Sequence, residues 1–163
     1  MSRAAADSVV IGIGNELRRD DGVGPAVARA VADRGLPGVR VLDCAAEPTA
    51  ILDAWTGTRL AVLVDAVAGG RPGRIGSHRL ADIAEPRPVS SHDLSLTQTW
   101  HLGRALGRAP AEVVVVTVDV ADTGHGVGLT AAVAAAVPAA SALVEAVVLG
   151  ALENPQEAPH QLP

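Results

Sequence analysis

Continuous apolar runs and helix-spaced apolar positions alternate along the chain. Runs of strand length at residues 60–64 and 113–118 are apolar or β-branched throughout, which is typical of strands covered on both faces. Shorter runs predict strands at residues 9–14 and 39–42, and a weak alternation at residues 75–80 predicts an edge strand or hairpin partner.

Helices are predicted between these strands. Apolar residues at helical spacing indicate helices over residues 23–31, 48–55, 93–107 and 130–149, and Pro138 is expected to kink or restart the last of them. Alternating strands and helices predict an α/β fold: a three-layer αβα sandwich around a mostly parallel, twisted sheet of about five strands, of the phosphorylase/hydrolase-like kind. Function is then expected at the carboxyl ends of the strands.

Length and composition favour one domain. A chain of 163 residues suits a single core over residues 1–152, and the proline-containing polar residues 153–163 are expected to form a flexible tail. The net charge of −5 provides no basic field for a phosphate backbone, so nucleic acid is not an expected partner. The single cysteine, Cys44, cannot form an intramolecular disulfide, which fits a reducing compartment.

No targeting or membrane segment is expected. The first residues lack the basic start and apolar run of a secretion signal. The Ala/Val-rich segment near the C-terminus is interrupted by Pro138, Ser141 and Glu145, so no stretch is expected to reach membrane-spanning length. The expected location is the cytoplasm.

A glycine-flanked acidic loop follows the first predicted strand, at residues 12–24. It does not match a dinucleotide fingerprint, because Leu17 stands where a third glycine is needed and Glu16, Asp20 and Asp21 would repel a phosphate. Carboxylates at a helix N-terminus are better suited to holding a cation or activating water. The alternative is that Asp20 or Asp21 only caps the helix.

Two further positions could carry chemistry. Asp65 ends the central apolar run, and His92 follows Ser91 just before a predicted helix. Carboxylates and an imidazole form a mixed oxygen and nitrogen ligand set that suits nickel or zinc. The simpler alternatives are a loop aspartate that opens a turn and a surface histidine. A serine hydrolase is disfavoured, because the chain contains no nucleophile-elbow motif.

The order and spacing of four motifs resemble the hydrogenase maturation proteases from about residue 9 to residue 148. The motifs are Gly12-Ile13-Gly14-Asn15, Asp20-Asp21-Gly22-Val23-Gly24, Val64-Asp65-Ala66 and Ser91-His92-Asp93-Leu94. The resemblance implies an endopeptidase that removes the C-terminal peptide of a nickel-iron hydrogenase large-subunit precursor after nickel insertion. It makes Asp21, Asp65 and His92 both the metal ligands and the catalytic residues, with nickel supplied by the substrate and no organic cofactor.

Other positions also match the family. The resemblance makes Asn15, in the glycine-rich loop, and Asp43, which closes the second strand, candidates for substrate binding. Glu16, Asp20 and His125 are secondary candidates. After Asp43 many members continue with glycines and a threonine, whereas this chain has Cys-Ala-Ala-Glu-Pro.

Several alternatives stay open from the sequence. An aspartic-type mechanism could use Asp21 and Asp65 without a metal. A non-catalytic nickel-binding accessory protein would use the same metal ligands but would not cleave the precursor. A hydrolase of the same architecture could act on another substrate, such as peptidyl-tRNA. The acidic net charge disfavours an RNA substrate. A monomer is the favoured oligomeric state, and neither a membrane nor a nucleic acid is an expected partner.

Overall fold

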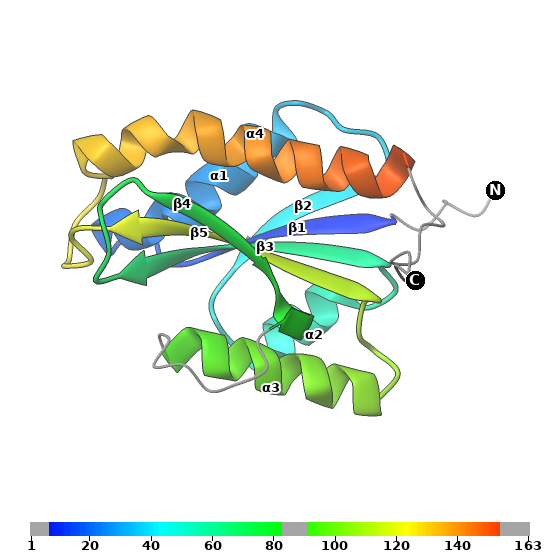
Figure 1. Ribbon diagram of the computed structural model, residues 1–163. Coiled ribbons are helices and arrows are strands. Elements are labelled where there is room, and N and C mark those ends of the chain that lie inside the picture. The colour runs from blue at the N-terminus through cyan, green and yellow to red at the C-terminus, as the bar shows by residue number, and fades with distance from the viewer. Residues whose placement is uncertain (1–6, 83–90, 154–163) are drawn as a thin grey trace, which may run out of the picture.

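The computed structural model describes residues 7–82 and 91–153, without the side chains of residues 91–95 and 151–153. In this part of the chain five strands form one sheet with the order β2-β1-β3-β5-β4 (Figure 1). The strands are β1 (Ser8–Ile13), β2 (Val39–Cys44), β3 (Leu60–Ala68), β4 (Ile75–Arg79) and β5 (Glu112–Val120). Only β4 among them is antiparallel to its neighbour, and it forms an edge, as predicted.

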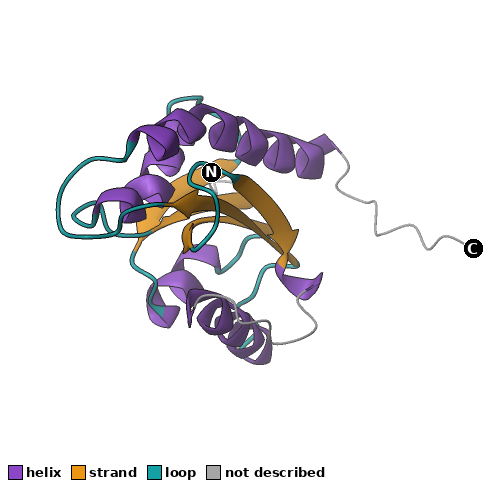
Figure 2. Cartoon of the chain, turned by 60° about the vertical axis from the view of Figure 1, so that its left-hand side comes forward, coloured by secondary structure: helices purple, strands orange, loops and turns teal. Residues whose placement is uncertain are grey.

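Helices cover both faces of the sheet, which confirms the three-layer α/β architecture (Figures 1 and 2). Helices α1 (Val23–Ala32) and α4 (Ala131–Glu153) lie on one face, and α2 (Pro48–Trp55) and α3 (Ser91–Ala105) lie on the other. Two short 3₁₀ helices, η1 (Arg19–Gly22) and η2 (Leu80–Asp82), follow β1 and β4.

Strand β3 is apolar along most of its length because both of its faces are buried. Val62 and Val64 belong to the core under α1 and α4, while Ala61 and Leu63 belong to the core above α2 and α3. All four side chains are fully buried. Side chains alternate between the faces of a strand, so Asp65 falls on the face that α2 and α3 cover.

Four sequence predictions about the elements are corrected. Asp65 does not end its strand, because β3 continues to Ala68 in register with an equally extended β5. Ser91 and His92 do not precede α3 but form its first residues. The expected restart at Pro138 is wrong, since α4 is one continuous helix, and the tail predicted from residue 153 begins one residue too early because Glu153 still belongs to that helix. The rest of the tail and the proline-rich loop at residues 85–89 lie outside the described residues.

Helix α4 also contradicts the expectation about membrane-spanning length. Residues Ala131–Gly150 are long and apolar enough to cross a membrane by length and composition, with a mean hydropathy of 2.1. Two of the three expected interruptions are accommodated locally: the Ser141 hydroxyl donates to the Val137 carbonyl, and Glu145 pairs with Arg34 of α1. The third, Pro138, lies inside the continuous helix. One face of α4 packs into the core through Val133, Val144 and Val148.

Candidate active site

The glycines of the first loop allow α1 to begin directly against the ends of two strands. A Cβ on Gly24 would lie 2.3 Å from the carbonyl oxygen of Ile13 and 2.6 Å from that of Val64. A Cβ on Gly12 would lie 2.4 Å from the carbonyl oxygen of Gly24. No side chain fits at either position. This backbone packing explains the glycine pattern and brings η1 to the carboxyl ends of β1 and β3.

Asp21 lies in η1 and is tied to the loop before it. The Asn15 backbone N–H donates to Asp21 Oδ2 at 2.9 Å, and a Cβ on Gly14 would lie 1.9 Å from the Asp21 carbonyl oxygen. The Asn15 side-chain oxygen accepts the Leu17 N–H at 2.9 Å, so it shapes the loop. Because η1 contacts β3, the backbone of the element that contains Asp21 lies beside the strand that carries Asp65.

Asp65 is buried inside β3, with 1% of its surface exposed. Its Oδ1 accepts the Ala66 backbone N–H at 2.9 Å. A carboxylate in this position is costly to bury unless hydrogen bonds or an opposite charge compensate it, because charge is poorly solvated inside a protein. Its place near the carboxyl edge of a parallel sheet is where α/β proteins bind ligands.

Two neighbours of Asp65 were not anticipated from the sequence. Thr117 of β5 is directly in register with Asp65, and Gly76 of β4 is in register with Thr117, so the three positions form one row across the sheet. A Cβ on Gly76 would lie 2.9 Å from the Thr117 hydroxyl oxygen. A hydroxyl therefore lies on the same face as the Asp65 carboxylate. In the sequence, Thr117 is one more β-branched residue of a predicted strand. Only the pairing of β3 with β5 shows that it lies beside Asp65.

His92 lies in the first turn of α3. Because α3 leads into β5, which runs parallel to β3, the helix begins at the carboxyl edge and covers the face on which Asp65 lies (Figure 1). The His92 side chain lies outside the described residues. Among the side chains that are described, no group of three His, Cys, Asp or Glu residues could hold a metal ion. The three-ligand site that includes His92 therefore stays a prediction.

Asp20 differs sharply from its neighbour Asp21. It is fully buried, and it accepts four hydrogen bonds from the segment that follows β5. Burial alone raises the pKa of Asp20, but hydrogen bonds from Thr130, Asp122 and Ala121 outweigh it and leave the pKa below its ordinary value. Asp20 is thus an ionised carboxylate whose hydrogen bonds hold the loop after β1 against the loop after β5.

The remaining candidates lie further from Asp65. Glu16 forms an ion pair with Arg29 of α1 on the surface. Asp43 is exposed in β2, in register with Gly12 and two strands away from β3. His125 is exposed in the β5–α4 loop, which lies against the loop that carries η1.

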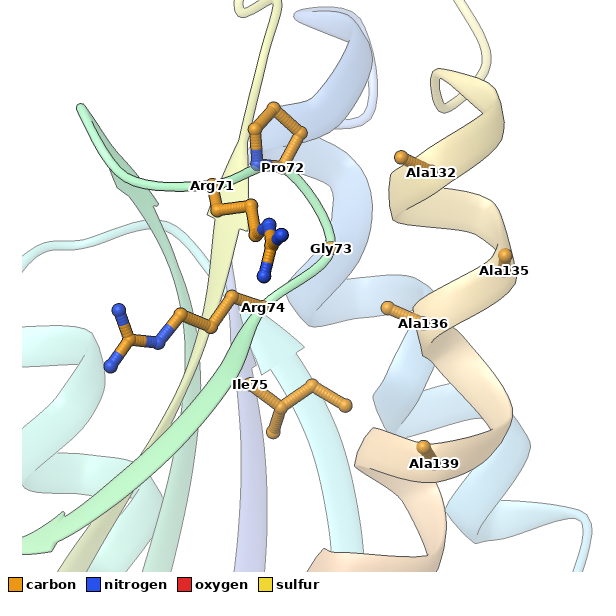
Figure 3. A pocket seen from close by; sticks show the side chains of 9 residues that line it. All are labelled: Arg71, Pro72, Gly73, Arg74, Ile75, Ala132, Ala135, Ala136 and Ala139. Atoms are coloured by element: carbon orange, nitrogen blue, oxygen red, sulfur yellow. The ribbon is translucent and has the colours of Figure 1, made fainter.

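A groove of about 460 Å³ lies between the β3–β4 loop and α4 (Figure 3). Ile75 of its wall packs with the core under α1 and α4, so the groove is on the face of the sheet opposite to Asp65. It is lined by Arg71, Pro72, Gly73, Arg74, Ile75, Ala132, Ala135, Ala136 and Ala139. The groove is therefore separate from the candidate active site.

Cys44 is not suited to act as a nucleophile. Burial raises the pKa of its thiol, and the negative charges of Asp43 and Glu47 raise it further. We expect iodoacetamide to modify Cys44 more slowly in the folded chain than in the urea-unfolded chain at the same neutral pH. Equal rates, followed by mass spectrometry, would contradict this description of the thiol.

A comparison with protein families identifies the family of this chain. A sequence model described as hydrogenase maturation protease matches residues 25–147, a range that contains Asp65 and His92 and begins after Asp21. No curated protein matches the sequence significantly.

Solved structures share the fold. The hydrogenase maturating endopeptidase HybD from E. coli has a TM-score of 0.74 and 23% identity, covering 88% of this chain and 93% of that one. A [NiFe] hydrogenase maturation protease HybD from Thermococcus kodakarensis has a TM-score of 0.71 and 23% identity, covering 86% and 97%. A hydrogenase 2 maturation peptidase from Thaumarchaeota archaeon SCGC_AB-539-E09 has a TM-score of 0.64 and 25% identity, with the same coverage.

The fold and the acidic residues define the class: an α/β protein with candidate catalytic carboxylates near the carboxyl edge of a parallel sheet, where proteins of this class bind ligands. Since the family match spans most of the chain, the protein belongs to the hydrogenase maturation protease family. It is accordingly a peptidase, a maturation endopeptidase, as the sequence resemblance predicted.

Proposed function

We propose that this endopeptidase removes the C-terminal peptide of a nickel-iron hydrogenase large-subunit precursor after nickel has been inserted. In this proposal Asp21, Asp65 and His92 meet around the nickel that the precursor carries, and the protein needs no organic cofactor. The observation that carries the proposal is the packing of η1, which contains Asp21, against the strand that buries Asp65 at one sheet edge.

The chemistry of the three side chains suits this task. Two carboxylates and an imidazole supply oxygen and nitrogen ligands, which nickel accepts readily. The first turn of α3 brings the backbone of residue 92 to the same edge and the same face of the sheet as Asp65. The family match supports the peptidase activity, while the identity of the substrate rests on this ligand set and on the hydrogenase named in the family description.

In this proposal the metal of the substrate and the two carboxylates share the chemistry of cleavage. The substrate's nickel polarises the scissile carbonyl, and a carboxylate of the Asp21 and Asp65 pair takes the proton of the attacking water. A precursor without nickel lacks the cation that the three side chains complete. Cleavage therefore waits for metal insertion, and the peptide is kept until the active site of the hydrogenase is filled.

The experiment is to incubate a purified nickel-loaded large-subunit precursor with this protein and to follow its intact mass. We expect the precursor to lose the mass of one C-terminal peptide and the N-terminal sequence to stay unchanged. A precursor that binds this protein and exchanges nickel with it, yet keeps its full mass, would favour a nickel-binding accessory protein instead. A mass that never changes with any precursor contradicts the proposed function.

A further inference from the structure

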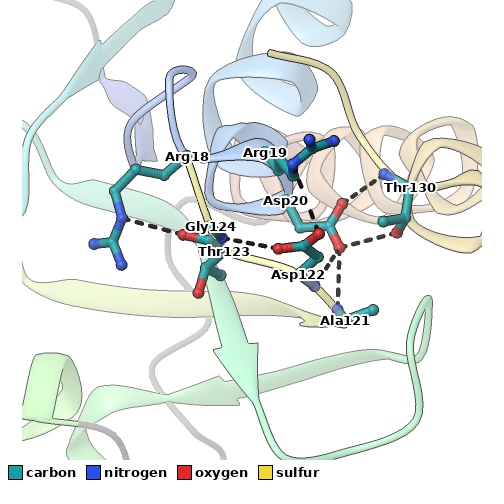
Figure 4. Close-up of polar contacts among 8 residues, drawn as sticks. All are labelled: Arg18, Arg19, Asp20, Ala121, Asp122, Thr123, Gly124 and Thr130. Carbon is teal, nitrogen blue, oxygen red and sulfur yellow. Dashed lines mark hydrogen bonds and ion pairs between the residues drawn. The ribbon is translucent and has the colours of Figure 1, made fainter. Parts of the chain in front are cut away.

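Asp20 joins two loops that are about a hundred positions apart in the sequence (Figure 4). Its Oδ2 accepts the backbone N–H groups of Ala121 and Asp122, both at 3.0 Å, and the hydroxyl of Thr130 at 2.9 Å. Its Oδ1 accepts the Thr130 N–H at 2.7 Å. The carboxylate is fully buried, so these protein groups replace the water that an exposed carboxylate would bind.

Backbone hydrogen bonds fasten the same two loops beside Asp20. The Arg19 N–H donates to the Gly126 carbonyl at 3.0 Å, and the Gly126 N–H donates to the Leu17 carbonyl at 2.9 Å. The Asp20 N–H donates to the Asp122 carbonyl at 2.9 Å. Arg19 has a φ of 48°, a left-handed conformation that a residue with a side chain adopts only when its surroundings hold it there.

These contacts hold η1 against the segment that follows the carboxyl end of β5. Asp21 follows Asp20 directly, and its carboxylate is oriented by the Asn15 N–H, which donates to Oδ2. A shift of the Asp20 anchor would therefore move Asp21 relative to β3. The Asp20 carboxylate is already engaged by the protein, because it accepts four hydrogen bonds, about as many as a carboxylate ordinarily holds.

We propose that Asp20 and Thr130 form a positioning pair for the cleavage reaction, holding Asp21 in place through the β5–α4 loop. This inference rests on the proposed function, since Asp21 must act in cleavage for its position to matter. The pair touches neither the substrate nor the metal. Its contribution is the fixed placement of η1 against the strand that carries Asp65.

The test compares Thr130→Val with Thr130→Ser. Valine keeps the shape of threonine but loses the hydroxyl bonded to Asp20, whereas serine keeps the hydroxyl. We expect Thr130→Val to lower kcat on the order of tenfold with little change in KM, because one hydrogen bond to a charged group is lost. Thr130→Ser should keep kcat near the wild-type value. Asp20→Asn replaces one acceptor oxygen by an NH₂ group, which then faces N–H or O–H donors and cannot accept from them. This variant should lower kcat about a hundredfold through misplacement of Asp21.

Ser141→Ala is the matched control for stability. It also removes one buried hydroxyl bonded within the chain, to the Val137 carbonyl of α4, but it does not touch either loop. We expect it to lower Tm by an amount similar to Thr130→Val and to leave kcat unchanged. Wild-type kcat in Thr130→Val, or an equal loss of kcat in Ser141→Ala, would overturn the positioning role. A wild-type enzyme that cleaves no precursor would instead refute the proposed function on which the pair depends.

Discussion

Cleavage of the precursor is expected to fall by roughly 10² to 10⁴-fold when Asp65 is replaced by asparagine, the range associated with a lost acid or base. Asparagine has the same shape, and its side-chain oxygen can still accept the Ala66 N–H that Asp65 Oδ1 accepts. The fold should therefore survive while the negative charge at the sheet edge is lost. The rate is measured from the appearance of trimmed large subunit by mass spectrometry, and the fold from circular dichroism and Tm.

Asp33→Asn provides the control for this loss of charge. Asp33 follows the C-terminal end of α1, whereas the candidate site is at the N-terminal end of that helix, and its side chain is exposed. We expect the variant to cleave at the wild-type rate. Cleavage by Asp65→Asn at the rate of Asp33→Asn would remove Asp65 from the mechanism.

Replacing Gly24 by alanine should lower the free energy of unfolding by about 3 kcal/mol or more, at the upper end of what overpacking costs. The added methyl group would lie within 2.6 Å of two carbonyl oxygens, those of Ile13 and Val64, which belong to the central strands. Neither backbone can move away without disturbing the sheet. Chemical denaturation of the purified variant, analysed with the denaturant m-value of the wild type, measures the loss in the free energy of unfolding.

Gly150→Ala is the control for this substitution. Gly150 also lies in a helix, but nothing lies within 4 Å of a Cβ built on it. Alanine is the better helix former, so this variant should gain up to about 1 kcal/mol. A Gly24→Ala variant as stable as Gly150→Ala would mean that α1 does not begin against the strand ends as described.

The architecture was predictable from the sequence because each layer leaves a local signature. A strand buried on both faces must be apolar throughout, as β3 is at residues 60–64, and a helix on a sheet must repeat its apolar residues at helical spacing. The predicted helix at residues 48–55 coincides with α2. The ends of β3 and β5 were placed too early, because pairing between neighbouring strands extends both past their apolar runs.

The distinction between Asp20 and Asp21 could not be predicted from the sequence. Two adjacent aspartates are equivalent candidates for a cap, a ligand or a base, and the resemblance to the family singled out only the second. What separates them is a contact with a segment about a hundred positions away, which buries Asp20 and leaves Asp21 partly exposed. Thr117 was missed for a similar reason, since the register between β3 and β5 is a property of the folded sheet.

Nickel dependence is the most direct test of the central claim that Asp21, Asp65 and His92 act together on the metal of the substrate. Nickel-loaded and nickel-free forms of one large-subunit precursor are incubated with the enzyme at equal concentrations, and the trimmed product is quantified by mass over time. The account predicts that only the nickel-loaded precursor loses its C-terminal peptide. Trimming of both forms at the same rate would contradict it.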